Sequence, residues 1–186
     1  MQNKPNTTDD LKFFTNTLMF AAIAHKEQKR KVDHSPYINH LIEVADLLTR
    51  VSGVTKVDTL QAAILHDILE DTPTTKEEIQ EYFGSDIANL VSELTDEPSL
   101  NLKDKREKQL SHVQKSSVEI KLIKLADHTS NVAAIPSDWS IERTKEYLAW
   151  SLVVATACSE ACSKLFDEYK RRYSFIGETI MKNKGE

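Results

Sequence analysis

The sequence contains few residues that make turns. Among its 186 residues there are only 4 glycines and 5 prolines, while 40% of the residues are hydrophobic and 28% are charged. Glycine and proline interrupt helices, and few stretches alternate between apolar and polar residues as exposed strands do. We therefore expect an all-α protein. Its length fits one domain with a substantial core.

The chain also lacks a disulfide framework, a long apolar run and an excess of basic residues. Its only cysteines, Cys158 and Cys162, lie four residues apart and would share one face of a helix, which favours core packing over redox or metal chemistry. No apolar run approaches the roughly 18 to 20 residues that cross a bilayer. The formal net charge of −5 argues against general nucleic-acid binding. We expect a cytoplasmic protein with neither a membrane nor a nucleic-acid partner, and a homo-oligomer stays possible.

Apolar residues recur at helical spacing along most of the chain. We expect residues 1–10 to form a flexible arm, 11–175 the domain and 176–186 a tail. Thr75-Lys76-Glu77-Glu78 fits a capping box, Ser116 or Ser117 can open a later helix, and Gly53 and Gly84 can end helices. The spacing predicts helices over residues 11–29, 39–51, 56–69, 85–94, 102–113, 117–135 and 141–173, and a short helix that begins near residue 75.

One stretch, Leu65 to Asp71, places four ionisable side chains in six positions directly after an apolar run. In a continuous helix these side chains fall within an arc of roughly 140° that the core-facing residues share. Buried carboxylates and imidazoles are costly unless they are paired, hydrogen-bonded or bound to a metal. The stretch therefore predicts a metal site or an active-site cleft. Its ionisable residues are His66, Asp67, Glu70 and Asp71.

A second polar stripe lies on the helix expected over 117–135, where Lys124, Asp127 and Asn131 share one face. Together with His40, the His66-Asp67 pair and Asp127 provide two imidazoles and two carboxylates from three helices. Mixed nitrogen and oxygen ligands suit a hydrolytic divalent ion such as manganese or iron better than structural zinc.

At these residues the chain resembles the HD superfamily of metal-dependent phosphohydrolases, which combine a separated His, an adjacent His-Asp pair and a distant Asp. It is similar in more detail to the hydrolase domain of the Rel/SpoT alarmone enzymes, from about Phe20 to Trp150. The matching motifs are Arg30-Lys31, Pro36-Tyr37-Ile38-Asn39-His40, His66-Asp67-Ile68-Leu69-Glu70-Asp71-Thr72, Phe83-Gly84 and Lys124-Leu125-Ala126-Asp127 with Asn131. The resemblance implies an HD-domain helical bundle of about eight to ten helices, in a stand-alone small alarmone hydrolase without a synthetase domain.

The resemblance also implies a reaction: Mn²⁺-dependent removal of the 3′-pyrophosphate from guanosine tetra- or pentaphosphate. Four residues would hold the metal, namely His40, His66, Asp67 and Asp127. Glu70 and Asp71 would orient or deprotonate the attacking water. The nucleotide would be bound by Arg30, Lys31, Lys124, Asn131 and Tyr147; Tyr147 is equally well explained as a core aromatic residue.

The chain departs from the long Rel/SpoT enzymes after Asp127, where it has His128-Thr129-Ser130 in place of Arg-Leu-His. The preference for base and phosphate therefore stays open, and the adenosine alarmones or a dinucleotide 2′-phosphate such as that of NADPH are alternative substrates. Two further alternatives are a silent alarmone-binding sensor and a structural helical domain with incidental metal. The complete set of ligands and acids disfavours the sensor, because buried charges are costly to keep for binding alone.

Overall fold

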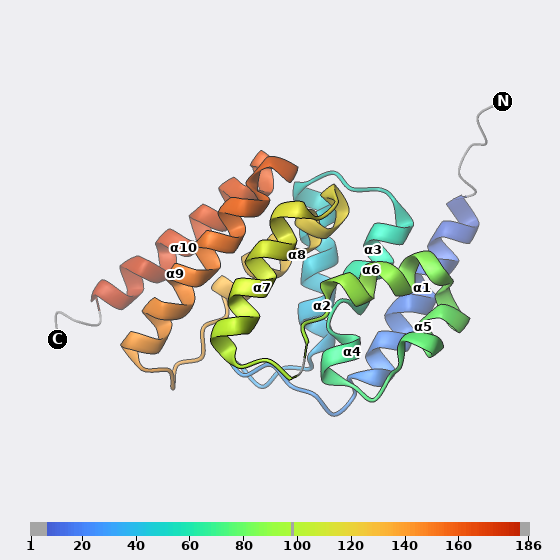
Figure 1. The fold of residues 1–186 in the computed structure, drawn as a ribbon, viewed down its shortest axis with the longest axis horizontal. Helices are drawn as coiled ribbons and strands as arrows, with labels where there is room; N and C mark the ends of the chain where they lie inside the picture. Colours follow the sequence, from blue (N-terminus) through green and yellow to red (C-terminus); the bar gives the residue numbers. More distant parts are fainter. Residues whose placement is uncertain (1–6, 98, 183–186) are drawn as a thin grey trace.

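The computed structural model describes residues 7–97 and 99–182 (Figure 1), so parts of the expected arm and tail, residues 1–6 and 183–186, lie outside the described residues. The described chain forms ten α-helices, one π-helical turn and one 3₁₀ turn, and within these residues there is no β-strand. The all-α class and the helix number are thereby confirmed. The elements are α1 (Thr7–Ala24), α2 (Ile38–Asp46), the π-helical turn (Leu47–Val51), α3 (Val57–Leu65), α4 (Ile68–Asp71), α5 (Lys76–Phe83), α6 (Ser85–Leu94), α7 (Leu102–Lys115), α8 (Val118–Val132), α9 (Ile141–Cys158), the 3₁₀ turn (Ser159–Ala161) and α10 (Ser163–Lys182).

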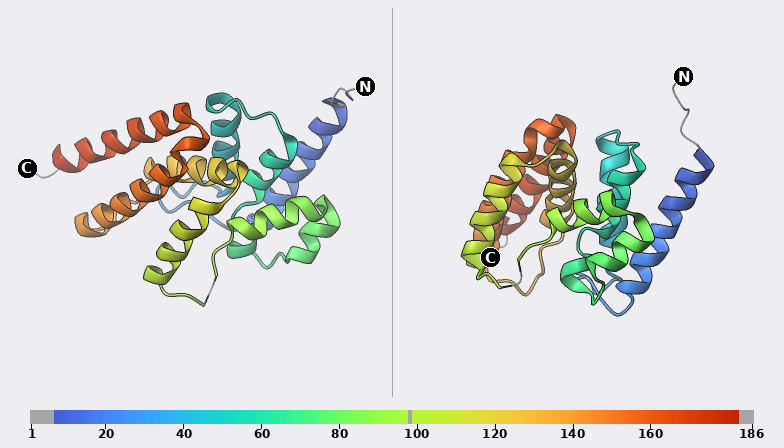
Figure 2. Two further views of the ribbon diagram at one scale, coloured as in Figure 1. Left: turned by 45° about the horizontal axis from the view of Figure 1, so that its top comes forward. Right: turned by 45° about the vertical axis from the view of Figure 1, so that its right-hand side comes forward.

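Helix α8 is the centre of the fold. It packs against α2, α3, α6, α9 and α10, and most of its side chains are buried. Helices α9 and α10 lie side by side on one flank of α8, while α1, α3, α5 and α6 form the other flank (Figures 1 and 2). Because α2 and α3 both contact α8, polar side chains at their ends are brought to the polar stripe of α8.

Local capping follows the sequence closely. The Thr75 hydroxyl accepts a hydrogen bond from the Glu78 amide, and the Glu78 carboxylate accepts one from the Thr75 amide, which completes the expected capping box. The Ser117 hydroxyl caps α8 by accepting a hydrogen bond from the amide of Ile120. Gly84 separates α5 from α6 with a φ of +89°, a conformation that residues with a Cβ rarely adopt.

Two of the long helices expected from the spacing are broken in the structure. The helix expected over 56–69 ends at Leu65, and α4 begins at Ile68, because Asp67 has φ −99° and ψ −2° in the sparsely populated bridge region. The helix expected over 141–173 is interrupted by the 3₁₀ turn and by Cys162, which is extended. Apolar periodicity continues across both interruptions, so spacing alone does not reveal them.

The second break corrects the prediction that the two cysteines share a helix face. Cys158 is the last residue of α9 and is fully buried, whereas Cys162 lies beyond the 3₁₀ turn and is half-buried. Both thiols are free. Core packing, the role expected for them, agrees with the burial of Cys158.

Other boundaries shift by less. Helix α1 begins at Thr7 and ends at Ala24, five residues before the expected end, and α2 changes to a π-helical turn at Leu47. Helix α8 ends at Val132, three residues earlier than expected, and α10 continues to Lys182. Within the described ranges, no helix combines the length and the apolar character needed to cross a membrane.

Candidate metal and nucleotide site

The break between α3 and α4 carries the His-Asp pair. His66 caps the C-terminus of α3 and is buried, and Asp67 caps the N-terminus of α4 and is partly buried. Glu70 and Asp71 follow on the single turn of α4 and are exposed. The expectation that all four lie on one core-facing arc of a continuous helix is therefore wrong: the turn directs the pair inward and leaves the acids at the surface.

Helices α2 and α8 and the turn between α3 and α4 bring the four expected metal ligands together. Nε2 of His66 lies 3.0 Å from Oδ2 of Asp67 and 3.6 Å from Oδ1 of Asp127. Nε2 of His40 lies 3.6 Å from the same Asp67 oxygen and 3.3 Å from the same Asp127 oxygen. Donor atoms of His40, His66 and Asp67 all lie within 4.8 Å of one another. Two imidazoles thus face two carboxylates around one point.

The donor set fits a divalent metal. Both Nε2 atoms are buried without a hydrogen-bond partner, which is costly in a protein interior unless something else satisfies them. Nδ1 of His66 is 2.8 Å from the carbonyl oxygen of Ala63, so this nitrogen carries a hydrogen, and the neutral ring would offer the lone pair of Nε2 to a metal. His40 has a corresponding partner for Nδ1 in the hydroxyl of Ser130, at 2.9 Å.

The imidazoles and carboxylates of this cluster change one another's pKa. Burial alone would lower the pKa of His66, but the carboxylates of Asp67 and Asp127 outweigh it and raise that pKa well above its ordinary value. Burial would raise the pKa of Asp127, yet the facing imidazoles of His40 and His66 hold it well below its ordinary value. Protons therefore balance the charge of the carboxylates here, and a bound cation would replace them.

Two neighbouring side chains orient the carboxylates. The Tyr37 hydroxyl donates a hydrogen bond of 2.6 Å to Oδ2 of Asp67. The Asn131 amide donates one of 2.6 Å to Oδ1 of Asp127, as expected for residues one helical turn apart. Partners of this kind fix the direction of ligand lone pairs.

The acidic pair separates to two sides of α4. The Glu70 carboxylate accepts a hydrogen bond of 2.6 Å from the amide of Asp96. Oδ2 of Asp71 accepts one of 2.8 Å from the amide of Gln28, whose own oxygen lies 2.5 Å from Nδ1 of the buried His25. Burial, with the charges of Asp96 and Asp67, raises the pKa of Glu70.

A cavity of about 290 Å³ adjoins His40 and Asp71. Of the five expected nucleotide-binding residues, it is lined by Arg30, Lys31, Asn131 and Tyr147. Tyr147 also packs edge-on against Trp139, another residue of the wall. The fifth residue, Lys124, is not part of this wall and lines a separate cavity of about 310 Å³ that contains Asp96.

His128 faces away from the ligands, toward α9. Its Nδ1 lies 2.9 Å from the hydroxyl of Ser151, its ring packs on Trp150, and burial lowers its pKa to about 4. His128 follows Asp127 directly in α8, so its side chain is rotated by about 100° around the helix axis and points away from the site.

Several residues at the site are not marked by the sequence as site residues. Tyr37 belongs to a motif, and its position three residues before His40 is the one signal that marks it. No sequence pattern marks the others, because their partners are distant in the chain. These residues are Gln28, Glu43, Ser130 and Trp139.

Comparison with known proteins agrees with this geometry. A family model described as HD domain matches residues 17–150. The chain is 39% identical over 166 residues to the Mus musculus protein "Guanosine-3′,5′-bis(diphosphate) 3′-pyrophosphohydrolase MESH1", covering 87% of this chain and 93% of the mouse protein. Over 135 residues it is 34% identical to "Bifunctional (p)ppGpp synthase/hydrolase SpoT" of Escherichia coli K12, covering 69% of this chain and 19% of that protein.

A solved structure shows the same fold. It is described as "A metazoan ortholog of SpoT hydrolyzes ppGpp and plays a role in starvation responses", and it matches with a TM-score of 0.83 and 34% identity over 89% of this chain and 96% of its own. The family match, the shared fold and the paired His and Asp side chains agree. The chain belongs to the HD domain family and is a relative of the MESH1 proteins.

Proposed function

We propose that this protein hydrolyses the 3′-pyrophosphate bond of guanosine 3′,5′-bis(diphosphate), releasing pyrophosphate and guanosine diphosphate, or guanosine triphosphate from the pentaphosphate. The observation that carries the proposal is the pair of unpartnered Nε2 atoms that face Asp67 and Asp127 beside a cavity lined by Arg30 and Lys31. Relatives of matching length are named for this reaction. The hydrolase domain in this proposal spans residues 11–175, and the proposal includes a cytoplasmic location.

The metal in the proposal is Mn²⁺, held by His40, His66, Asp67 and Asp127. Two imidazoles and two carboxylates without a thiolate suit this ion. When bound, a divalent cation supplies Lewis acidity at phosphoryl oxygens and lowers the pKa of water.

The acidic pair would manage the proton of the attacking water. Asp71 lies at the cavity, and the hydrogen bond from Gln28 holds its carboxylate in place there. Glu70 has a raised pKa, which brings it nearer to the range where a carboxylate accepts and returns a proton efficiently. We assign both residues to general-base and water-orienting roles.

The nucleotide would lie in the 290 Å³ cavity. Lys31 is exposed at its wall, and Arg30 presents a guanidinium that can stack on a base or bind phosphate. Asn131 and Tyr147 provide an amide and an aromatic ring on the opposite elements α8 and α9. Lys124 would act on the other side of the metal, near Glu70, rather than on the base.

Product analysis tests the proposal. The Mn²⁺-loaded protein is incubated separately with guanosine tetraphosphate, its adenosine analogue and NADPH, and the products and kcat/KM are measured. We expect equal amounts of guanosine diphosphate and pyrophosphate, with the highest kcat/KM for the guanosine compound. Asp67→Ala should abolish this, while Asp58→Ala, an exposed acid on α3, should not.

Other outcomes identify the alternatives. Turnover of only the adenosine compound would replace the substrate and keep the chemistry. Release of inorganic phosphate from NADPH alone would make the protein a dinucleotide phosphatase. Tight binding of guanosine tetraphosphate without any cleavage would contradict the proposal in favour of a sensor.

A further inference from the structure

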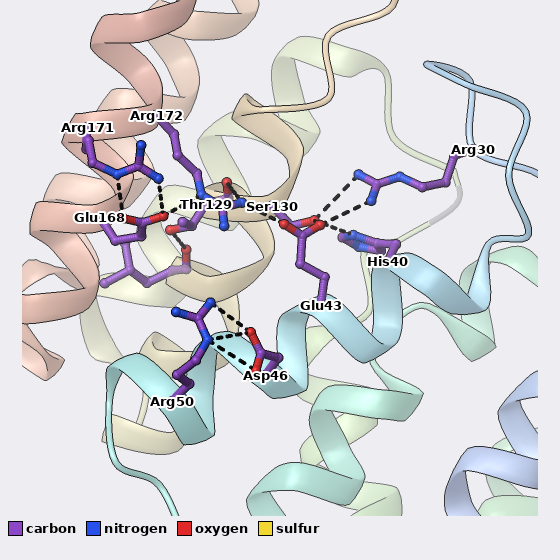
Figure 3. Close-up of polar contacts among 11 residues, drawn as sticks. Arg30, His40, Glu43, Asp46, Arg50, Thr129, Ser130, Glu168, Arg171 and Arg172 are labelled. Atoms are coloured by element: carbon purple, nitrogen blue, oxygen red, sulfur yellow. Dashed lines mark hydrogen bonds and ion pairs between the residues drawn. The ribbon is translucent and has the colours of Figure 1, made fainter.

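Glu43 joins the metal site to the C-terminal helix. It lies on α2, three residues after His40, and its side chain is about one third exposed at 31%. Its carboxylate accepts hydrogen bonds from Ser130 (2.6 Å), Arg30 (3.1 Å) and Arg172 (2.6 Å), as Figure 3 shows. The expected roles of the site residues do not account for a carboxylate at this place.

The direction of the Ser130 hydrogen determines the tautomer of His40. A serine hydroxyl has a single hydrogen, and the 2.6 Å contact donates it to Oε2 of Glu43. Burial would raise the pKa of Glu43, but hydrogen bonds from Ser130, Arg172 and Arg30 outweigh it and lower that pKa, so the acceptor is a carboxylate. The Ser130 oxygen must therefore accept from Nδ1 of His40, 2.9 Å away.

This tautomer is the one that a metal requires. With its hydrogen on Nδ1, His40 presents the lone pair of Nε2, which is buried, unpartnered and 3.3 Å from Asp127. His66 obtains the same tautomer from the backbone carbonyl of Ala63. In His40 the corresponding partner is a side-chain pair, so it can be removed by substitution without changing the backbone.

Helix α10 fixes the Glu43 carboxylate. Arg172 donates to Oε1 of Glu43 and, over 3.2 Å, to the carbonyl oxygen of Thr129, and it pairs with Glu168 at 2.8 Å. These contacts are drawn in Figure 3. Arg172 lies beyond residue 150, where the HD family match ends. Arg172, which lies outside the matched domain, thus fixes the carboxylate that Ser130 connects to His40.

We propose that Glu43 is a positioning residue that acts through Ser130 to hold His40 in the tautomer that offers Nε2 to the metal. The inference rests on the metal site of the proposed function. Loss of a hydrogen-bond partner behind a metal ligand commonly costs about 10- to 100-fold in metal affinity or activity.

Mn²⁺ affinity of the metal-free protein, measured by calorimetry without nucleotide, tests the proposal. Ser130→Ala keeps both ion pairs of Glu43 and removes the hydroxyl that joins Glu43 to His40, together with its 3.5 Å contact from Arg30. We expect Mn²⁺ affinity to fall about 10- to 100-fold. Glu43→Gln should also lower Mn²⁺ affinity, since its one amide oxygen cannot accept from Ser130 and Arg172 together. The loss should be smaller, because the Ser130 hydroxyl still lies beside His40. The double variant should bind no more weakly than Ser130→Ala, because residues that act in series are not additive.

Asp46→Asn is the matched control. Asp46 lies on the same helix and pairs with Arg50 at 2.8 Å, away from the metal ligands (Figure 3), so its loss should leave Mn²⁺ affinity unchanged. Unchanged affinity in folded Ser130→Ala, or additive losses in the double variant, would overturn the proposal. If Glu43→Gln does not fold, Ser130→Ala alone decides.

The tautomer gives a second readout that is independent of hydrolysis. In ¹⁵N-labelled metal-free protein, at a pH where its imidazole is neutral, His40 should carry its hydrogen on Nδ1 in the wild type and populate both tautomers in Ser130→Ala. A wild-type hydrogen on Nε2 would contradict the inference even if guanosine tetraphosphate is cleaved. The expected tautomer without cleavage would support the inference and reject the proposed function.

Discussion

The hydroxyl of Tyr37 donates a 2.6 Å hydrogen bond to Oδ2 of Asp67, the same oxygen that faces Nε2 of both His40 and His66. Burial, together with the charge of Asp67, raises the pKa of Tyr37 far above its ordinary value, so the phenol stays a donor. Asp67 therefore has one oxygen whose lone pairs are directed by a residue outside the ligand set.

Tyr37→Phe removes this hydrogen bond and retains the ring. We expect Mn²⁺ affinity to fall about 10-fold or more, because the carboxylate loses the partner that orients it. Calorimetry measures the change, with Tyr82→Phe, an exposed tyrosine of α5, as control. Equal affinity in the Tyr37 variant and the wild type would show that Asp67 needs no such partner.

Gln28→Ala tests whether Asp71 must be held in place. Gln28 is the donor to Oδ2 of Asp71, and its loss should lower kcat by about 10- to 100-fold through misplacement of a catalytic group. Mn²⁺ affinity should stay unchanged, because neither residue belongs to the ligand set. Gln80→Ala on the exposed face of α5 serves as control. A loss of metal affinity that matches the loss of kcat would refute this division of roles.

Lys124→Met should change the pH dependence of hydrolysis. Burial raises the pKa of Glu70, and the charge of Lys124 partly opposes that shift. A general base must be deprotonated, so activity is lost as pH falls through this pKa; without Lys124 the pKa rises, and the acid limb of kcat/KM should move to higher pH.

Lys121→Met is the control for this shift. Lys121 lies on the same helix, is similarly buried and pairs with Glu160 instead. The acid limb should stay in place in this variant. A limb that does not move in Lys124→Met, or moves to lower pH, would exclude Glu70 as the base whose pKa controls the reaction.

Metal should stabilise the fold. The imidazoles and carboxylates converge only in the native state, so Mn²⁺ at about 100 times its Kd should add about 2.7 kcal/mol to the free energy of unfolding. Thermal unfolding with Mn²⁺ and with a chelator measures this difference. Asp127→Asn should largely remove it. A stabilisation that persists in that variant would place the metal elsewhere.

The helical class and the His66-Asp67 pair could be predicted because both follow from features that are local in the chain. Apolar spacing marks the helices, the capping box marks a helix start, and adjacent charged residues after an apolar run mark a site. The rotation of about 100° that separates His128 from Asp127 likewise follows from helix geometry alone.

What could not be predicted depends on contacts between distant residues. Glu43 and Arg172 are 129 residues apart in the chain, and neither shows its role until α2 and α10 both pack on α8. The break at Asp67 could not be predicted either, since the apolar pattern of the predicted helix continues through it. Lys124 was grouped with Asn131 on one stripe, but the cavities on the two sides of the ligands separate them.

Anomalous diffraction from crystals of the Mn²⁺-loaded protein, measured at the manganese absorption edge, locates the metal. We expect one peak bounded by Nε2 of His40 and His66 and by carboxylate oxygens of Asp67 and Asp127. No peak among these four residues in a protein that still hydrolyses guanosine tetraphosphate, or a peak held by other side chains, would contradict this metal site.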